Sequence, residues 1–150
     1  MSRIKLYYHS GSKNHGCEAI VRGTSKILQE DLSLFSIRPN EDIKYGLNDI
    51  CEIIDDKEEV INKYSLKNIL GVLDIKINNK IDTVIKNRRK NILDNIKKDD
   101  ICFSIGGDNY CYAGTDIIGA LNNNIRKKGA KTVLWGCSVE PDVINGDVSN

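Results

Sequence analysis

Short apolar segments alternate with longer amphipathic ones along this chain, and no other feature of the sequence limits its fold as strongly. Five segments, at 3–8, 32–37, 50–54, 101–105 and 132–135, have the length and residue types of β-strands. Between them, apolar residues recur every three or four positions, as they do on one face of an α-helix. This alternation predicts βαβ units and a parallel sheet whose right-handed crossovers place helices on both faces. The expected fold is α/β, a Rossmann-like doubly wound domain.

The first half of the chain contains clear helix signals. A helix is expected at about 17–30, and Asn14 stands ahead of it in a position suited to an N-cap. Pro39 is expected to end the second strand. A short helical turn is predicted at 42–47, before the third strand begins.

The second half of the chain has a different helical pattern. A helix near Leu66 is expected to break near Gly71 or Asp74. The last helix is expected to have Thr115 as its N-cap and to stop at Gly129. Between these two helices, one long helix is predicted from five isoleucines that share a stripe: Ile77, Ile81, Ile85, Ile92 and Ile96.

The composition excludes several classes of protein. The chain has 150 residues, enough for one domain spanning 1–150, and its 22 Lys and Arg against 21 Asp and Glu give a formal net charge of +1. This balance argues against nucleic-acid binding, which usually comes with a marked basic excess. No apolar run approaches the ~20 residues that span a bilayer, and the N-terminus lacks the apolar core of a signal peptide.

The cysteines indicate a reducing compartment. There are five of them, an odd number with no C-x-x-C pair, which favours free thiols in the cytoplasm over a disulfide framework. The spacings between Cys17, Cys102, Cys111 and Cys137 match no zinc pattern, and Cys51 is expected in the core. We therefore expect no metal site and no cofactor.

Three of the predicted strands end in loops that contain glycine, at 9–16, 106–109 and 136–138. In open parallel sheets, ligands bind beyond the carboxyl ends of the strands, near the point where the strand order reverses. Glycine allows a ligand to approach the main chain because it has no Cβ. The three loops are expected to converge at one edge of the sheet and to form the ligand site there.

The first of these loops resembles a phosphate loop only in part. Gly11 and Gly16 have the G-x-x-x-x-G spacing, but Cys17-Glu18 stands where the Lys-Ser/Thr pair should follow, so ATP or GTP hydrolysis is not expected. Free N–H groups and the helix dipole could hold an anion. Glu18 would repel an anion placed very close, which leaves hydroxyl groups as the other candidate ligand. A purely structural tight turn is a third interpretation.

The same segments resemble a known family. Residues 10–20, SGSKNHGCEAI, resemble the N-G-D/C-E-A-I signature of the polysaccharide pyruvyl transferase family. Residues 105–108, IGGD, resemble its second glycine-rich segment, where members usually have three glycines, and residues 134–141, LWGCSVEP, resemble its third. The order and spacing agree over nearly the whole chain.

The resemblance implies a function and an architecture. It implies transfer of a pyruvyl group from phosphoenolpyruvate to a sugar of a bacterial surface glycan, which forms a ketal. It also implies a two-lobed, GT-B-like enzyme in which this chain is the N-terminal lobe, while the Arg and His residues that hold the donor lie in a C-terminal lobe absent from this chain. The 150-residue chain alone is then expected to have little or no activity.

Candidate site residues come from the three loops. His15 and His9 are the candidates for proton transfer, although a lone histidine in a loop is more often structural. Asp108 and Asn109 suit sugar hydroxyls, but Asp and Asn after two glycines also simply form turns. The candidate substrate-binding residues are Ser10, Gly11, Asn14, Gly16, Glu18, Gly106, Gly107, Asp108, Asn109, Gly136 and Ser138.

One basic cluster lies outside the loops. It consists of Lys86, Arg88, Arg89, Lys90, Lys97 and Lys98. A solvated helix face is the ordinary interpretation. Attraction to anionic lipid head groups at the inner face of the membrane is the alternative, and it would suit an enzyme that acts on a lipid-linked glycan.

Two other functions remain open from the sequence alone. One is a non-catalytic Rossmann-like module that binds a sugar or a nucleotide. The other is a lobe of a sugar-nucleotide glycosyltransferase, although no donor-binding signature is visible in this chain.

Overall fold

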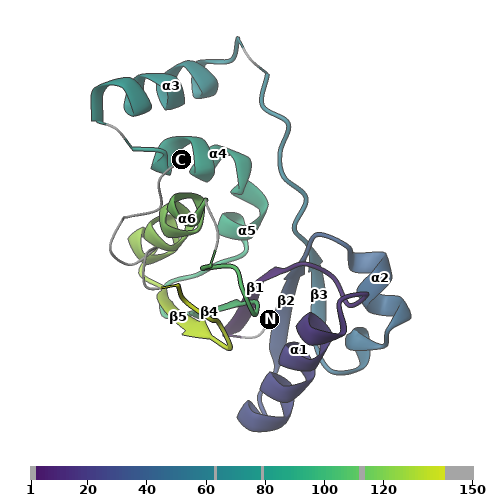
Figure 1. The fold of residues 1–150 in the computed structure, drawn as a ribbon. Coiled ribbons are helices and arrows are strands. Elements are labelled where there is room, and N and C mark those ends of the chain that lie inside the picture. The colour runs from purple at the N-terminus through teal and green to yellow at the C-terminus, as the bar shows by residue number, and fades with distance from the viewer. Residues whose placement is uncertain (1–2, 63, 79, 112–113, 141–150) are drawn as a thin grey trace.

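The computed structural model describes residues 3–62, 64–78, 80–111 and 114–140, which fold around one five-stranded sheet (Figure 1). The strand order is β3-β2-β1-β4-β5, and every neighbouring pair is parallel. The chain therefore starts in the middle of the sheet, builds it outward in one direction and then returns to build the other side. This is the Rossmann-like, doubly wound α/β fold that the sequence predicts. The strands are β1 (Ile4–His9), β2 (Leu32–Ser36), β3 (Glu52–Asp55), β4 (Ile101–Ile105) and β5 (Lys131–Trp135).

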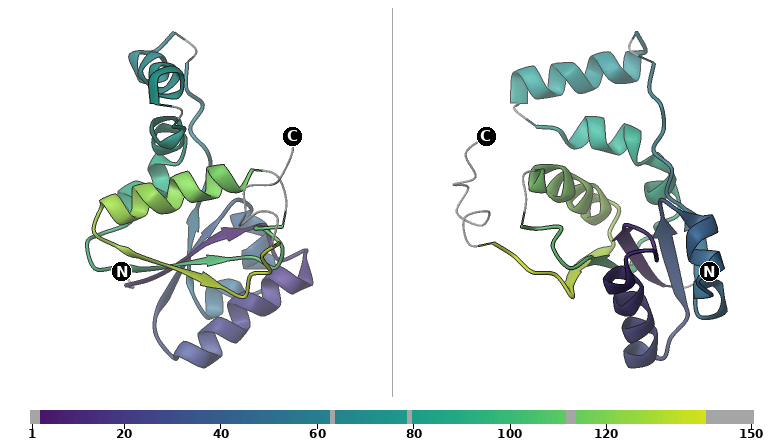
Figure 2. Two further views of the ribbon diagram at one scale, coloured as in Figure 1. Left: turned by 60° about the vertical axis from the view of Figure 1, so that its left-hand side comes forward. Right: turned by 45° about the vertical axis from the view of Figure 1, so that its right-hand side comes forward.

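Helices cover both faces of the sheet (Figure 2). α1 (His15–Leu28) and the short 3-10 helix η1 (Leu47–Asp49) pack on one face, and α2 (Pro39–Lys44) lies beside them. The other face is covered by α5 (Lys90–Asp94) and α6 (Thr115–Lys127). α4 (Asp82–Arg88) adds to this layer, and α3 (Leu66–Asn78) lies on α4, as the outermost element.

The alternation of side chains along the strands divides the core in two. Tyr7, Phe35 and Cys102 point to the face covered by α4, α5 and α6, where Ile92 and Leu121 are buried. Leu6, Leu34 and Phe103 point to the opposite face, against α1 and η1. Each face of the sheet carries an apolar cluster because helices cover both faces, as is usual for a parallel sheet.

The single long helix predicted from the isoleucine stripe is wrong. The chain forms three helices there, with α3 ending at Asn78, α4 beginning at Asp82 and α5 at Lys90. Ile85, Ile92 and Ile96 are buried, but Ile77 is 75% exposed. The break between α4 and α5 falls at Arg89, whose buried guanidinium lies 2.9 Å from Asp56. An ion pair with a residue outside the helical segment is invisible to a periodicity argument.

The expected break near Gly71 or Asp74 is also wrong. α3 runs through both positions without interruption. A Cβ on Gly71 would lie 2.8 Å from Cγ2 of Val84, so the glycine is there for a close helix contact. Tertiary packing explains a residue that sequence alone interprets as a helix breaker.

Two helix starts also differ from expectation, and one agrees. Pro39 opens α2 instead of only ending a strand, because proline is well suited to the first turn of a helix. The N-cap of α6 is Gly114, in a left-handed conformation, so Thr115 is the first helical residue. Asn14 caps α1, as expected, and its side chain accepts a hydrogen bond from the N–H of Gly16.

None of the helices in the described part of the chain has the length and apolar content that crossing a bilayer requires.

Candidate functional site

The strand order reverses between β1, the central strand, and β4 beside it, and a hydrogen bond joins the loop after β4 to the end of β1. Nδ2 of Asn109 donates to the carbonyl oxygen of Tyr8 at 3.2 Å, across the switch point. The loop after β5 joins the same edge, since the N–H of Ser138 donates to the carbonyl of Gly107 at 2.6 Å. The three glycine loops therefore converge at the carboxyl edge of the sheet, where ligands bind in folds of this kind.

The amide groups of the first loop are already occupied. The N–H of Ser12 donates to Asp42 Oδ1 at 2.8 Å, and the N–H of Lys13 donates to Glu41 Oε1 at 2.6 Å. Gly11 has φ +106°, and a Cβ there would lie 2.6 Å from that Glu41 oxygen. Two carboxylates of α2 thus take amides that a phosphate loop would offer to its ligand, and a third carboxylate, Glu18, lies in the first turn of α1. This arrangement disfavours an external anion at the loop.

Asp42 organises this loop from the inside. Its carboxylate is fully buried and also accepts from Oγ of Ser12 at 2.6 Å, from Oγ of Ser36 and from Nε2 of His9 at 2.9 Å. Burial raises the pKa of Asp42, but the hydrogen bonds from Ser12, Ser36 and His9 outweigh it and hold the pKa below its ordinary value. An ionised, fully satisfied carboxylate makes the loop rigid.

The two candidate histidines lie in opposite environments. The His9 side chain is completely buried against Asp42, so a sugar could not touch it in this arrangement. The His15 side chain is 77% exposed at the start of α1, and its ring lies edge-on to Tyr45 with centroids 5.8 Å apart. Of the two histidines, His15 is the one that can reach a ligand.

His15 is held by a carboxylate that is itself anchored. Nδ1 of His15 lies 3.1 Å from Glu18 Oε2, while Nε of Arg22 donates to Glu18 Oε1 at 2.7 Å. The hydrogen bonds from Arg22 and from His15 lower the pKa of Glu18, which keeps it ionised. An ionised carboxylate only accepts, so Nδ1 carries the proton in this contact and Nε2 of the neutral ring is left as the acceptor. The arrangement suits an imidazole that removes a proton from a hydroxyl.

The second loop divides into a rigid part and an exposed part. Gly106 has φ +136°, and a Cβ there would lie 2.0 Å from Nδ2 of Asn109. Asn109 also donates to the carbonyl of Ile105 at 3.0 Å, so it closes the turn and joins it to β1. Gly107 and Asp108 are exposed. In this loop, Gly106 and Asn109 shape the backbone, while Gly107 and Asp108 face solvent.

The remaining candidates surround the same edge. Ser10 is exposed, with Oγ 3.1 Å from Sγ of Cys17, and Asn14 and Gly16 are exposed beside it. Gly136, with φ +64°, and Ser138 are exposed in the third loop. Among the candidate residues, the side chains presented to solvent are therefore hydroxyls, an amide and an imidazole, together with Asp108; Lys13 is exposed beside them.

A group of titratable residues at this edge was missed by the sequence argument. Asp56 follows β3, is 2% exposed and lies 2.9 Å from the guanidinium of Arg89, which in turn lies 5.6 Å from the centre of the Tyr8 ring. Burial raises the pKa of Asp56 to about 7, with Arg89 opposing the shift. Tyr8 has φ +66°, a conformation rare for a bulky residue. No local sequence pattern marks contacts between residues so far apart.

The basic cluster expected from the sequence is divided by the fold. Arg89 is buried in its ion pairs with Asp56 and Glu58. Lys97 and Lys98 line a separate hollow with Arg3 and Asp99, at the amino end of the sheet. Lys86, Arg88 and Lys90 remain exposed on α4 and α5. The interpretation as one continuous basic face is therefore wrong.

The fold and the edge together define a Rossmann-like α/β domain with its candidate ligand site at the β1/β4 switch point. Comparison of the chain with protein-family models, with curated proteins and with solved structures finds no match.

Proposed function

We propose that this chain is a lobe of a polysaccharide pyruvyl transferase and that its β1/β4 edge binds hydroxyl groups of the sugar acceptor. The proposal rests on one observation: the backbone N–H groups of Ser12 and Lys13 already donate hydrogen bonds to carboxylates of α2. Such a loop is unsuited to the phosphate and carboxylate of phosphoenolpyruvate. The exposed side chains of Ser10, Asn14 and His15 suit neutral hydroxyls.

In this proposal His15 is the base for the acceptor. Transfer requires one sugar hydroxyl to lose its proton as its oxygen attacks C2 of the enol, while the enol methylene gains a proton. Phosphate then leaves, and a second hydroxyl of the sugar attacks C2 and loses its proton, which closes the ketal. Nε2 of His15 would accept the hydroxyl proton, with Glu18 stabilising the imidazolium that results. His9 is a positioning residue, since it holds Asp42 and through it the loop. Cations that hold the donor would come from the second lobe that the family resemblance implies.

The proposal also places the chain in the cytoplasm. All five cysteines are free in the structure, which fits a reducing compartment.

Phosphate release tests the proposal. Protein expressed from the whole reading frame is incubated with phosphoenolpyruvate and a panel of bacterial glycan acceptors, and free phosphate is measured. We expect release with at least one acceptor, and about 100-fold lower kcat for His15→Gln, because general-base catalysis contributes on that order. Lys26→Gln, an exposed change on α1 away from the edge, is the matched control and should retain full activity.

Two results would contradict the proposal. The first is the absence of phosphate release with every acceptor, and the second is full activity of His15→Gln. Glycan binding that shifts the amide NMR signals of residues 10–17 without any turnover would instead assign a non-catalytic sugar-binding module.

A further inference from the structure

The helix α3 presents its apolar side chains to solvent. Five of them, spaced at i, i+3, i+4, i+7 and i+11, form one stripe along the helix, and their exposed fractions run from 44% to 77%. Ile69, Leu70 and Leu73 form the centre of this stripe. In a helix of a globular domain, a stripe of this kind normally faces the core. The apolar stripe of α3 consists of Leu66, Ile69, Leu70, Leu73 and Ile77.

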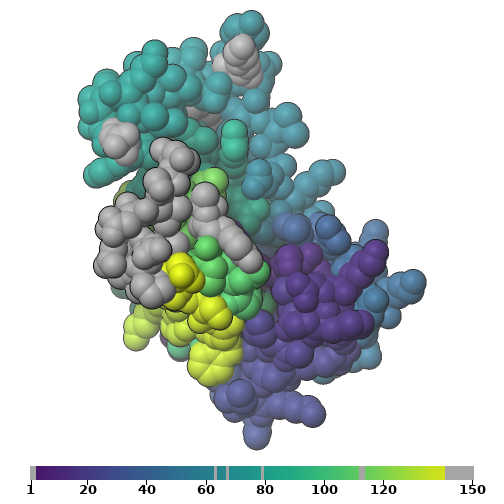
Figure 3. Space-filling view, viewed as in Figure 1, coloured from purple at the N-terminus to yellow at the C-terminus, as the bar shows by residue number. Residues whose placement is uncertain are grey.

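The opposite side of α3 attaches it to the domain. Gly71 is buried against Val84 of α4, and Oδ2 of Asp74 accepts a hydrogen bond from Oγ1 of Thr83 at 2.5 Å. Gly71 lies about half a turn around the helix from Leu73, and Asp74 lies about a quarter turn from it. The side of α3 that carries Gly71 and Asp74 therefore contacts α4, and the apolar stripe remains exposed. Figures 1 and 3 show α3 projecting beyond the layer formed by α4 and α6.

The surroundings of the stripe are strongly basic. Residues 64–90 contain seven Lys or Arg and two Asp, a formal charge of +5 in a chain whose net charge is only +1. Of these cations, Arg89 is buried and paired with Asp56 and Glu58, and it does not add to the surface charge. Lys76 is exposed on α3 itself, and Lys80 follows two residues after the helix ends. Both acids are engaged, Asp74 with Thr83 and Asp82 with Lys127 at 2.6 Å.

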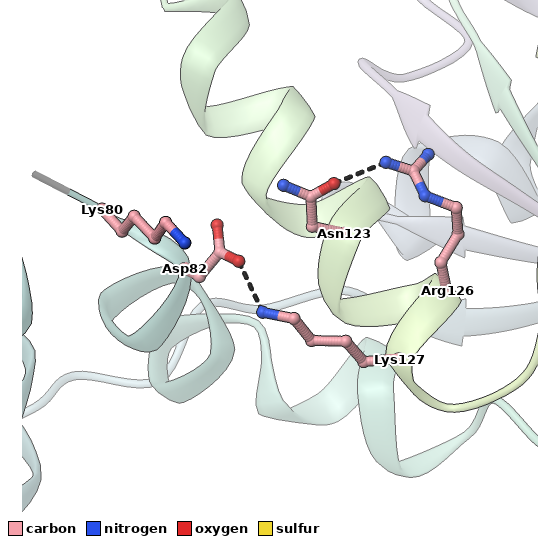
Figure 4. Close-up of a pocket in the computed structure, with 5 residues that line it drawn as sticks. All are labelled: Lys80, Asp82, Asn123, Arg126 and Lys127. Carbon is pink, nitrogen blue, oxygen red and sulfur yellow. Dashed lines mark hydrogen bonds and ion pairs between the residues drawn. The ribbon is translucent and has the colours of Figure 1, made fainter. Parts of the chain in front are cut away.

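Basic side chains continue into two hollows between α4, α5 and α6. One hollow, with a volume of about 480 Å³, is lined by Lys80, Asp82, Asn123, Arg126 and Lys127. Figure 4 shows Lys127 extending from α6 to Asp82, Arg126 turned to Asn123 on the same helix, and Lys80 just ahead of α4. A second hollow of about 480 Å³ includes Lys86, Lys127 and Lys128 in its lining, together with Lys90 and its ion-pair partner Asp94. Hollows with several ammonium groups suit the phosphate of a lipid head group.

We infer that α3 docks the protein on an anionic lipid bilayer. The apolar stripe would enter the boundary between head groups and acyl chains, and the surrounding lysines would contact lipid phosphates, as in amphipathic helices that lie in the interface. Charge complementarity selects this partner over a second copy of the chain. Two copies joined through α3 would bring two basic segments together, and like charges repel. Such docking would bring the domain close to a lipid-linked acceptor.

Vesicle flotation tests this inference without any sugar or donor, so its result is independent of the proposed function. The full chain is mixed with phosphatidylcholine vesicles that contain about one third phosphatidylglycerol, or none. We expect binding to the anionic vesicles and loss of most of it at about 1 M NaCl, where charges are screened within about 3 Å. Lys80→Glu/Lys86→Glu should weaken binding more than tenfold, since each lysine near such a surface contributes about fivefold.

The apolar stripe is tested by Leu70→Ser/Ile77→Ser, which should weaken binding more than about tenfold because two side chains no longer enter the bilayer. Matched controls are Ile27→Ser, which removes an exposed isoleucine from α1, and Lys26→Glu on the same helix, and both should bind like the original chain. Circular dichroism verifies that each variant folds.

Three outcomes would overturn the inference. The first is equal binding to vesicles with and without the anionic lipid. The second is binding of Leu70→Ser/Ile77→Ser to anionic vesicles as strong as that of the original chain. The third is a dimer in sedimentation that Leu70→Ser/Ile77→Ser converts to a monomer, with no vesicle binding by either, which would assign α3 to self-association.

Discussion

At the scale of single residues, the geometry of the candidate site depends on buried polar groups that the fold brings together. Asp42 accepts hydrogen bonds from groups in the first loop, at the end of β1 and at the end of β2. The two histidines illustrate the consequence. His9 is in a buried position that stabilises the loop, and His15 is exposed beside Glu18, where it can act on a ligand.

Asp42→Asn should lower the free energy of unfolding by about 3 kcal/mol, because one oxygen that accepts hydrogen bonds would become an NH2 group that only donates. The groups that now donate to the carboxylate would then compete for a single acceptor in a buried site. Urea unfolding measures this effect. Asp49→Asn, an exposed change nearby, serves as the control and should alter the free energy by less than about 0.5 kcal/mol. A cost for Asp42→Asn no larger than that of the control would refute a structural role of the carboxylate.

The two glycines of the second loop should respond differently to alanine. Gly106→Ala places a Cβ 2.0 Å from Asn109 Nδ2 at φ +136°, and should cost about 3 kcal/mol of unfolding free energy. Gly107→Ala meets nothing within 4 Å and should cost less than about 0.5 kcal/mol. Thermal or urea unfolding of both variants gives the comparison. Similar losses for the two would show that the turn does not depend on Asn109 in the way described.

At the scale of elements, α3 is the least integrated helix of the domain. It touches α4 through Gly71 and Asp74, while its apolar stripe makes no contribution to the core. By contrast, α6 buries Ile118, Leu121 and Ile125 against the sheet. The attachment of α3 to the domain therefore depends on its packing against α4.

Two alanine substitutions test this attachment, because they should change the free energy of unfolding in opposite directions. Gly71→Ala should lower the unfolding free energy by about 1–3 kcal/mol, or increase amide exchange in α3, because the new methyl forces α3 away from Val84. Gly119→Ala, in the middle of α6 with nothing within 4 Å, should instead raise it by about 0.5–1 kcal/mol through helix propensity. Stabilisation by both changes would mean that α3 does not pack closely on α4 in solution.

At the scale of the whole molecule, the Asp56–Arg89 pair joins the end of the first half of the sheet to the helices that lead into the second half. The N–H of Glu59 also donates to the carbonyl of Arg88 at 3.0 Å, beside the same pair. The long crossover from β3 to β4 is held against the sheet at this point. Its buried carboxyl makes the stability of the whole domain dependent on pH.

Wild-type protein should lose stability relative to Asp56→Asn as the pH rises from about 4 to about 7. The pKa of Asp56 is raised from 3.8 to about 7, so in this window the folded chain holds a proton that the unfolded chain has released. Folding in this window takes up a proton, so a rise in pH makes folding less favourable and lowers the free energy of unfolding, by up to about 4 kcal/mol. Urea unfolding of both proteins at several pH values measures the difference. The raised pKa would be contradicted if the difference in unfolding free energy between the two proteins stayed constant with pH, or if it changed in favour of the wild type as the pH rose.

Local patterns were sufficient to predict the strands, most helices and the three loops. Alternation and helical periodicity come from neighbouring residues, and the parallel α/β topology follows from short apolar strands separated by helices. The convergence of the glycine loops could be predicted for the same reason, since the carboxyl ends of parallel strands share one edge of the sheet.

Long-range packing decided the rest. The periodicity of the isoleucines contains no information about the ion pair of Arg89 with Asp56, which accompanies the break between α4 and α5. Nor does the spacing of Gly11 and Gly16 show that carboxylates of α2, about thirty residues away, occupy the loop amides. The direction in which α3 turns its apolar stripe depends on its contact with Val84. These features depend on residues distant in the chain, and their energies exist only once the fold has brought those residues together.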